Sequence, residues 1–304
     1  MAQDEDAELS RALARLGDGI SSLLGNEAER ATQISGLSLY RSTAPTPPMP
    51  CSYEPSLLVI PQGNKRVELG RTSYLFGQAK FLLTSVELPI VSQVVIASEE
   101  TPYLAFFFKF QIAAVRDVLN TEEIQVPESP PGPHGMAIGE ATAALVDACT
   151  RLVRLLDKPA DIPFMGKQIE REIIYRLLQS SQGDRLRAVA TFGDQSHRTA
   201  KAVAWLRANY DKPLRVEELA TLAGMGLSTL HHHFRALTAM SPLQFQKQLR
   251  LRAARSRMLS DKMDAASAAF AVGYESPSQF SREYRRFFGE PPIRDIQALR
   301  LTGK

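Results

Sequence analysis

The stretch that decides the fold is VEELATLAGMGLSTLHHHFRALTAMSPLQFQKQLRLRAARSRML, residues 216–259. Its apolar residues recur at helical spacing, which predicts helices over 216–223, 227–238 and 242–259. The tripeptide GMG at 224–226 turns the chain between the first two helices, because glycine tolerates backbone angles that other residues avoid. A helix, a glycine-containing turn and a second helix are typical of the helix–turn–helix unit that reads DNA.

The two faces of the second helix differ in chemistry. The apolar face is predicted to pack the two helices together through Leu219, Ala220, Ala223, Leu230, Phe234 and Leu237. The remaining face is polar and carries Ser228, His231, His232 and Arg235. We expect this polar face to enter a major groove.

The same pattern returns in VGYESPSQFSREYRRFFGEPP, residues 272–292. A helix over 265–272 is followed by a turn and by a helix that opens on SPSQ at 276–279, where an N-cap serine, a first-turn proline and a glutamine form a capping-box signature. The inner face carries Phe280, Tyr284 and Phe287. The outer face is polar and cationic, with Ser278, Gln279, Ser281, Arg282, Arg285 and Arg286.

A continuous helix over 242–259 connects the two units. Its length is about 27 Å at 1.5 Å per residue. Such a spacer is expected to hold two recognition helices about one DNA turn, roughly 34 Å, apart. One chain would then read two successive major-groove segments on one face of the duplex.

Charge is unevenly distributed along the 304 residues. Residues 195–304 hold 18 Lys/Arg and 9 Asp/Glu, a net charge of +9, whereas residues 1–194 carry a net charge of −6. A basic module on an acidic remainder is typical of nucleic-acid binding, although a solvated basic face would give the same count.

The first two thirds of the chain have a different pattern. Short β-rich runs between residues 56 and 110, separated by Pro, Gly and Asn, predict a compact β-barrel or sandwich. The proline-dense segment 43–50 is expected to be an extended arm, and 183–196 a hinge. A helix over 138–156 has a seven-residue apolar repeat, which fits either a coiled-coil seam for self-association or packing within its own domain.

Residues 197–294, with both units quoted above, closely resemble the AraC/XylS transcription regulators. YEPSLLVIPQGNKRVELG at 53–70 and GMAIGEATAALVDACTRLVRLLDKPADIPFMGKQIEREIIYRLLQSSQG at 135–183 are similar to the N-terminal domain of one subgroup of that family. The resemblance implies an α+β protein: a polar, helical lead-in over 1–40, a cupin-like β-barrel with helices for dimerisation over 41–194, and an all-α DNA-binding domain over 195–304. It also places base-reading positions at Leu227, Ser228, His231, His232, Pro277, Ser278, Gln279, Ser281 and Arg282.

Two positions depart from the family pattern. Gly226 stands where a serine N-cap is common, and Gly caps a helix without a side-chain acceptor. Near the C-terminus, Ile293-Arg294-Asp295 stands where a Tyr-Arg pair usually follows the proline.

Metal and enzyme chemistry have little support in the sequence. Consecutive residues on a helix point about 100° apart, so His231, His232 and His233 cannot all bind one ion. Before residue 197 the sole histidine is His134, so the imidazole ligands of a metal-dependent cupin enzyme are absent. Nucleophile, P-loop and dinucleotide-binding signatures are absent as well.

Cys51 and Cys149 are expected to be inert thiols, with redox sensing as the alternative.

These patterns predict a cytoplasmic, effector-responsive transcription regulator and no enzyme, metal or other cofactor. Its predicted partners are promoter or operator DNA, a small-molecule effector, a second copy of the chain and RNA polymerase, with no membrane. Arg235, Arg285 and Arg286 are predicted to join the base-reading residues as DNA contacts, the last two at phosphates. The alternatives are an architectural DNA-binding protein whose N-terminal domain takes no ligand, and an enzyme fused to a DNA-binding domain.

Overall fold

A computed structural model describes residues 2–120, 124 and 135–301. The chain divides into two compact units, Met1–His197 and Arg198–Lys304, called here the N-terminal and the C-terminal unit. His134 and most of the proline-rich segment 126–135 lie outside the described residues. No helix in the described part of the chain is long and apolar enough to cross a bilayer.

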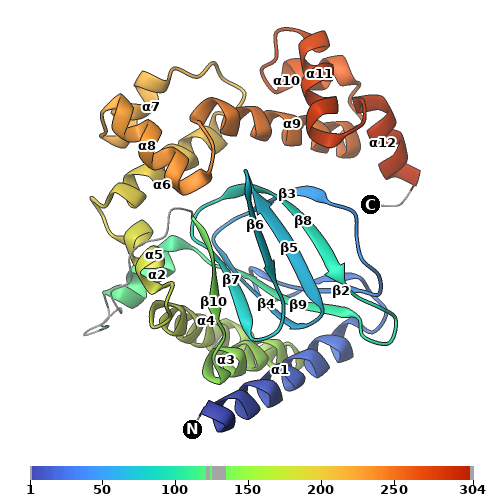
Figure 1. The fold of residues 1–304 in the computed structure, drawn as a ribbon, viewed down its shortest axis with the longest axis vertical. Coiled ribbons are helices and arrows are strands. Elements are labelled where there is room, and N and C mark those ends of the chain that lie inside the picture. Colours follow the sequence, from blue (N-terminus) through green and yellow to red (C-terminus); the bar gives the residue numbers. More distant parts are fainter. Residues whose placement is uncertain (1, 121–123, 125–134, 302–304) are drawn as a thin grey trace. The chain divides into compact units, whose positions relative to one another are not determined.

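The strands of the N-terminal unit form two antiparallel sheets (Figure 1). The six-stranded sheet has the order β1 (Glu29–Ala31), β2 (Leu37–Ser42), β9 (Tyr103–Lys109), β4 (Ser56–Gln62), β7 (Lys80–Thr84) and β10 (Met136–Glu140). The four-stranded sheet has the order β3 (Met49–Tyr53), β8 (Leu88–Ile96), β5 (Asn64–Leu69) and β6 (Thr72–Phe76). The predicted α+β class is confirmed, with a β-sandwich at the N-terminus. A cupin-like relationship stays a prediction.

Alternation along the strands explains why both faces of the six-stranded sheet are buried. Leu57 and Val59 of β4 belong to a hydrophobic core shared with the helices. The intervening Leu58 is also buried but points to the opposite face. On that face the ring of Phe107 lies 5.2 Å from the ring of Tyr53, which belongs to the other sheet. The aromatic run of β9, Phe106 to Phe108, is therefore core.

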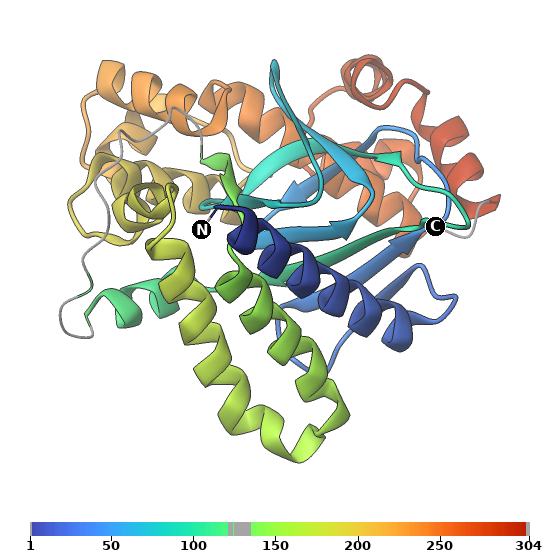
Figure 2. The same ribbon diagram turned by 60° about the horizontal axis from the view of Figure 1, so that its bottom comes forward.

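Helices cover the outer face of the six-stranded sheet. They are α1 (Ala2–Leu24), α2 (Ile112–Leu119), α3 (Ala143–Arg154), α4 (Ile162–Leu178) and α5 (Gly183–Ala190). Figure 2 shows α1 lying against the sheet, with α3 beside α1 and α4 beside α3. Leu16 and Ile20 of α1 are fully buried in the same core as Leu152 of α3. The N-terminal helix is thus part of the unit's core.

The structure decides one open alternative in the N-terminal unit and corrects two local predictions. The heptad residues Leu145, Leu152 and Leu155 face the core of their own unit, so they do not form an intermolecular seam. Residues 136–140 form a strand, because their backbone pairs with β7, and the helix begins only after the N-cap Thr142. The segment 183–196 contains α5 and is not an irregular hinge.

The predicted arm at 43–50 is hydrogen-bonded to the four-stranded sheet. The backbone N–H of Thr46 donates to the carbonyl of Val94, and the N–H of Val94 donates to the hydroxyl of Thr46. β3 then pairs with β8 from Met49 onward. These bonds hold the arm in place in this structure.

We expect Cys149 to resist alkylation in the native protein. Its side chain is fully buried in α3, and burial raises the pKa of the thiol above its usual value. Less thiolate is then present at pH 7, so Cys149 should react more than about tenfold more slowly than after unfolding in urea. Site-resolved mass spectrometry after iodoacetamide treatment measures this, and equal rates in both states would contradict it.

Candidate nucleic-acid interface

The C-terminal unit is built from helices. They are α6 (Gln195–Ala208, which begins at the end of the N-terminal unit), α7 (Val216–Ala223), α8 (Leu227–Thr238), α9 (Pro242–Ser260), α10 (Ala265–Ala271), α11 (Pro277–Phe288) and α12 (Pro292–Leu301). The boundaries of α7 and α8 are the predicted ones. Apolar periodicity did not indicate the short helix α12, whose packing on α9 and α11 is a tertiary effect.

The first helix–turn–helix unit consists of α7 and α8. Gly224 ends α7 in the left-handed region with φ of 66°, and the backbone N–H groups of Gly224 and Met225 close the turn on carbonyls of α7. Gly226 begins α8 without a side-chain cap, as its lack of a side chain requires. The predicted inner face is buried, at Leu219, Ala220, Ala223, Leu230, Phe234 and Leu237.

The outer face of α8 is open to solvent. Leu227, Ser228, His231, His232 and Arg235 are all exposed. His233 is half-buried, with its ring edge-on to that of His232 at 5.2 Å. Within the described residues, no group of three or more His, Cys, Asp or Glu side chains is placed to hold a metal ion.

The second helix–turn–helix unit consists of α10 and α11. Asp264 caps α10 by accepting from the backbone N–H groups of Ala266 and Ser267. Gly273 turns the chain with φ of 86°, and a Cβ there would overlap the carbonyl of Asp211. Ser276 caps α11 by accepting from the N–H of Gln279 at 3.3 Å.

The outer face of α11 carries the predicted cationic surface. Ser278, Gln279, Arg282, Arg285 and Arg286 are exposed, while Pro277 and Ser281 are half-buried. Phe280 and Tyr284 are buried on the opposite face, and Phe287 packs against the same cluster. The two recognition helices therefore present matching arrangements, an apolar inner face and a polar outer face.

Gln279 is held by a neighbour that sequence reasoning missed. The amide Nε2 donates to Oε1 of Glu283 at 3.3 Å, so it does not close a capping box with Ser276 as predicted. The same carboxylate accepts from Nζ of Lys247 at 2.9 Å and from the hydroxyl of Tyr274 at 2.8 Å. The i, i+4 spacing of Gln279 and Glu283 was a readable signal, but the contacts with Lys247 and Tyr274 come from tertiary packing.

The pKa of Glu283 is lowered by this network. Burial raises the pKa, but the hydrogen bonds from Lys247, Tyr274 and Gln279 lower it by more. A carboxylate with a depressed native pKa stabilises the fold above its unfolded pKa, and this stabilisation is lost as the pH falls through the native pKa.

Removing the Glu283 carboxylate should therefore cost stability in a pH-dependent way. We expect Glu283→Ala to lower the free energy of unfolding at pH 7 by about 1–2 kcal/mol. The difference from wild type should shrink as the pH falls below the ordinary glutamate pKa of about 4.3. Urea titrations at pH 7 and in acid measure this, with the exposed Glu290→Ala as control. A difference that is independent of pH would contradict the assigned network.

The connector α9 is anchored at its middle and at its start. Ser241 and Gln244 form a complete capping box at its first turn. Arg250 donates from Nε to the carbonyl of Tyr210 at 2.7 Å and from Nη1 to that of Gly273 at 2.8 Å. The side chain therefore links α9 to both the loop after α6 and the turn of the second unit.

A buried ionic triad closes the second unit. Asp295 of α12 accepts from Nε and Nη2 of Arg255 at 2.8 and 2.7 Å, and from the hydroxyl of Tyr284 at 2.6 Å. Burial and the hydrogen bond to Asp295 raise the pKa of Tyr284 above its usual value. Asp295 is one of the residues that depart from the family pattern, and its carboxylate joins α9, α11 and α12.

Comparisons with known proteins agree with this geometry. Residues 33–185 match the family described as AraC-type transcriptional regulator N-terminus, and residues 219–297 match a helix-turn-helix domain. The HTH-type transcriptional regulator ArgR of Pseudomonas aeruginosa is 25% identical over 47% of this chain and 44% of its own length. The HTH-type transcriptional activator RhaS of Yersinia pestis is 30% identical over 50% of this chain and 52% of its own length. The chain thus spans about half the length of the curated relatives it matches.

A solved structure has a similar fold over most of the chain. ToxT from Vibrio cholerae with a bound unsaturated fatty acid superposes with a TM-score of 0.59. It covers 86% of this chain and 94% of its own, at 10% sequence identity. At that identity the likeness concerns the fold alone.

Proposed function

Because the chain belongs to the AraC-type transcriptional regulators, we propose that it is a sequence-specific DNA-binding regulator of transcription in the cytoplasm, controlled by a small molecule that its N-terminal unit binds. One observation carries this proposal: α8 and α11 each bury an apolar face and expose a polar one, within a unit of net basic charge. The matched relatives are named as transcriptional regulators or activators, which favours this function over the fused enzyme.

The exposed side chains divide by the contacts that their chemistry suits. Gln279 and Arg282 lie in the first half of α11 and suit hydrogen bonds with base edges, the arginine with guanine. On α8 the corresponding positions are Ser228, His231 and His232. Arg285 and Arg286, together with Arg235 on α8, suit phosphates, which supply salt-dependent affinity without sequence choice.

The regulator is proposed to act as a dimer. With the heptad residues of α3 buried in their own unit, the outer face of α4 is the better surface for a second copy. Phe164 of α4 is 69% exposed, and Met165 and Tyr175 are exposed as well. Exposed apolar side chains on one helix are typical of interaction sites. Contact with RNA polymerase stays a prediction.

Genome-wide footprinting of the purified protein at fixed salt tests the proposed function. Wild type should give sharp, bipartite sites, and Gln279→Ala with Arg282→Ala should lose them, because each base contact is worth about 1–3 kcal/mol. The matched control is Arg294→Ala with Gln297→Ala on α12, which removes the same two residue types from an exposed face at the same spacing.

The footprinting result also distinguishes a sequence-specific regulator from an architectural DNA-binding protein. Diffuse, salt-labile binding that is unchanged in the α11 variant would favour a DNA-bending protein and contradict sequence reading by the second unit. Sites that survive in the α12 control but disappear in the α11 variant would support the proposal, and the neighbouring promoters would indicate the pathway of the effector.

A further inference from the structure

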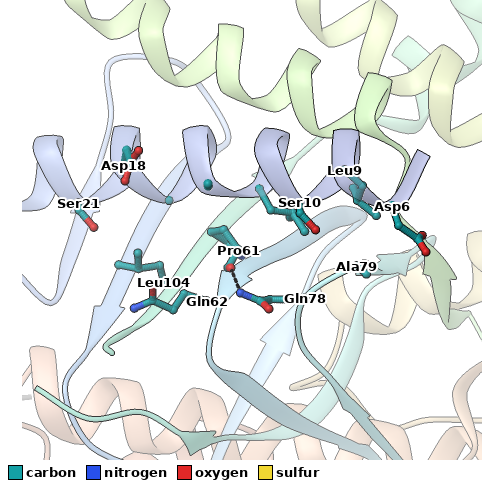
Figure 3. A pocket seen from close by; sticks show the side chains of 13 residues that line it. Asp6, Leu9, Ser10, Asp18, Ser21, Pro61, Gln62, Gln78, Ala79 and Leu104 are labelled. Atoms are coloured by element: carbon teal, nitrogen blue, oxygen red, sulfur yellow. Dashed lines mark hydrogen bonds between the residues drawn. The ribbon is translucent and has the colours of Figure 1, made fainter. Parts of the chain in front are cut away.

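A pocket of about 440 Å³ lies between α1 and the ends of the strands beside it (Figure 3). This volume is within the range of small-molecule sites. Eight of its thirteen lining residues come from α1, and the others come from β4, β9 and the turn between β6 and β7. The matched AraC-type segment begins only at residue 33, so most of the wall lies in a helix outside it.

The sequence of α1 leaves this pocket open. Asp6, Ser10, Gly17 and Ser21 are spaced by four or seven residues, so they lie on one face of the helix. That face adjoins the core-facing side of the helix, since Leu13 belongs both to the core and to the pocket wall, and its other residues are mainly small. Gly17 sits in the middle of a helix, where glycine is about 1 kcal/mol less favourable than alanine. A Cβ there would meet Pro61 and Leu104 only at ordinary contact distances, so packing does not require the glycine.

The opposite wall presents hydrogen-bond acceptors. Gln78 donates from Nε2 to the carbonyl of Pro61 at 2.7 Å, and Gln62 donates from Nε2 to that of Pro102 at 2.8 Å. These bonds orient both amides and use one N–H of each, so each glutamine keeps its carbonyl oxygen as an acceptor and one N–H as a donor. A register shift in the pairing of β4 with β9, between Val59 and Gln62, places the glutamine at this edge.

The charged side chains that line the pocket are all acidic. Asp6 and Asp18 contribute carboxylates, and none of the thirteen lining residues, all of them in the described part of the chain, is Lys, Arg or His. Leu9, Leu13 and Leu104 supply an apolar floor. Acceptors and negative charge around an apolar floor complement a ligand with several N–H donors, a positive charge and a hydrocarbon portion.

We propose that the α1 pocket binds an organic cation, an amine or a guanidinium on a short apolar stem, and that this ligand is the effector of the regulator. The binding site is argued from the pocket alone, whereas the role as effector rests on the proposed function.

Direct binding to the full-length protein tests the site. The probes are hexylamine and hexylguanidine, with hexanol and hexanoate as neutral and negative probes of the same chain length, measured by ligand-observed NMR and calorimetry. Asp6 and Asp18 lie about 18 Å apart along α1, so a probe with one positive charge can pair with just one of them. Asp6→Asn with Asp18→Asn should weaken binding of the cationic probes at least about tenfold, because whichever carboxylate pairs with the cation is removed. The control, Asp4→Asn with Glu8→Gln, removes two exposed carboxylates of α1 that do not line the pocket.

A second pair of variants tests whether the probes occupy the volume of the α1 pocket. Gly17→Met places a side chain in the pocket and should abolish binding, whereas Ala7→Met adds the same side chain at an exposed position of α1 and should leave binding unchanged. The carboxylate variants alter only exposed side chains, so they show whether the α1 pocket binds the cationic probes even if Gly17→Met fails to fold.

The outcomes separate the pocket from the proposed function. Cationic probes that bind more weakly than about 10 mM, or hexanoate that binds as well as hexylamine, would overturn the pocket proposal while leaving DNA footprints intact. Pocket-dependent binding that leaves the footprints unchanged would overturn the role as effector but keep the site. If the probes bind in the pocket but the protein gives no specific footprints, the proposed regulatory function is contradicted and the proposed ligand site is retained.

Discussion

Asp295→Ala is expected to lower the free energy of unfolding of the C-terminal unit by about 3–5 kcal/mol, the usual cost of breaking a buried ion pair from one side. The carboxylate accepts two hydrogen bonds from Arg255 and one from Tyr284, and the side chains of Arg255 and Asp295 are only 19% and 10% exposed. Without Asp295, a guanidinium and a phenol are left buried with their main acceptor removed. Because the triad joins α9, α11 and α12, the second recognition helix should lose its fixed position and DNA affinity should fall.

Two measurements check this result. Urea unfolding can be followed by the fluorescence of Trp205, the single tryptophan of the chain, and hydrogen exchange reports α11 and α12 directly. An apolar replacement of the whole triad, Arg255→Met with Asp295→Leu and Tyr284→Phe, should recover much of the lost stability. A loss below about 1 kcal/mol for Asp295→Ala would mean that the triad contributes no more than a surface pair.

Gly273→Ala is expected to destabilise the second helix–turn–helix unit by more than about 3 kcal/mol. The left-handed backbone costs an alanine about 1–2 kcal/mol by itself. The added Cβ would also overlap the carbonyl of Asp211 and would lie 2.9 Å from Nη2 of Arg250. The turn would have to move, which would disturb the hydrogen bonds of Arg250 to the carbonyls of Gly273 and Tyr210, each a charge-assisted bond worth about 1.5–3 kcal/mol.

The first unit provides the matched control. Gly224 has a similar backbone, with φ of 66°, but a Cβ there would meet no atom within 4 Å. Gly224→Ala should therefore cost only the conformational penalty, about 1–2 kcal/mol. Equal losses of stability for the two variants in urea titrations would show that the contact with Asp211 is unimportant.

The N-terminal unit shows where strand prediction from sequence stops. The runs that became β4 to β9 are rich in β-branched and aromatic residues, so their local pattern was sufficient. β1, β2, β3 and β10 were missed, because they are short or only partly buried and exist through pairing with distant strands. The heptad repeat of α3 was ambiguous for a related reason: a seven-residue apolar period fits a partner helix or an internal sheet equally well.

In the candidate DNA interface too, some features were predicted from the sequence and others depend on tertiary contacts. The sequence predicted which residues of α8 and α11 lie on the outer face, because helical periodicity assigns each residue to a face once the apolar side is known. It did not predict that Glu283 would hold Gln279, or that Arg250 and Arg255 would be structural. Those roles depend on carbonyls and carboxylates contributed by Tyr210, Gly273 and Asp295, which are distant in sequence.

What the sequence determined by itself is the chain's secondary structure where periodicity is strong, its two helix–turn–helix units and the family to which it belongs. These follow from local rules: the period of apolar residues, N-caps and glycines at turns. What only the tertiary structure decided is the burial of the α3 repeat, the ionic triad of Asp295 and the pocket beneath α1. Each of these depends on segments that are far apart along the chain, and no local pattern specifies which of them meet.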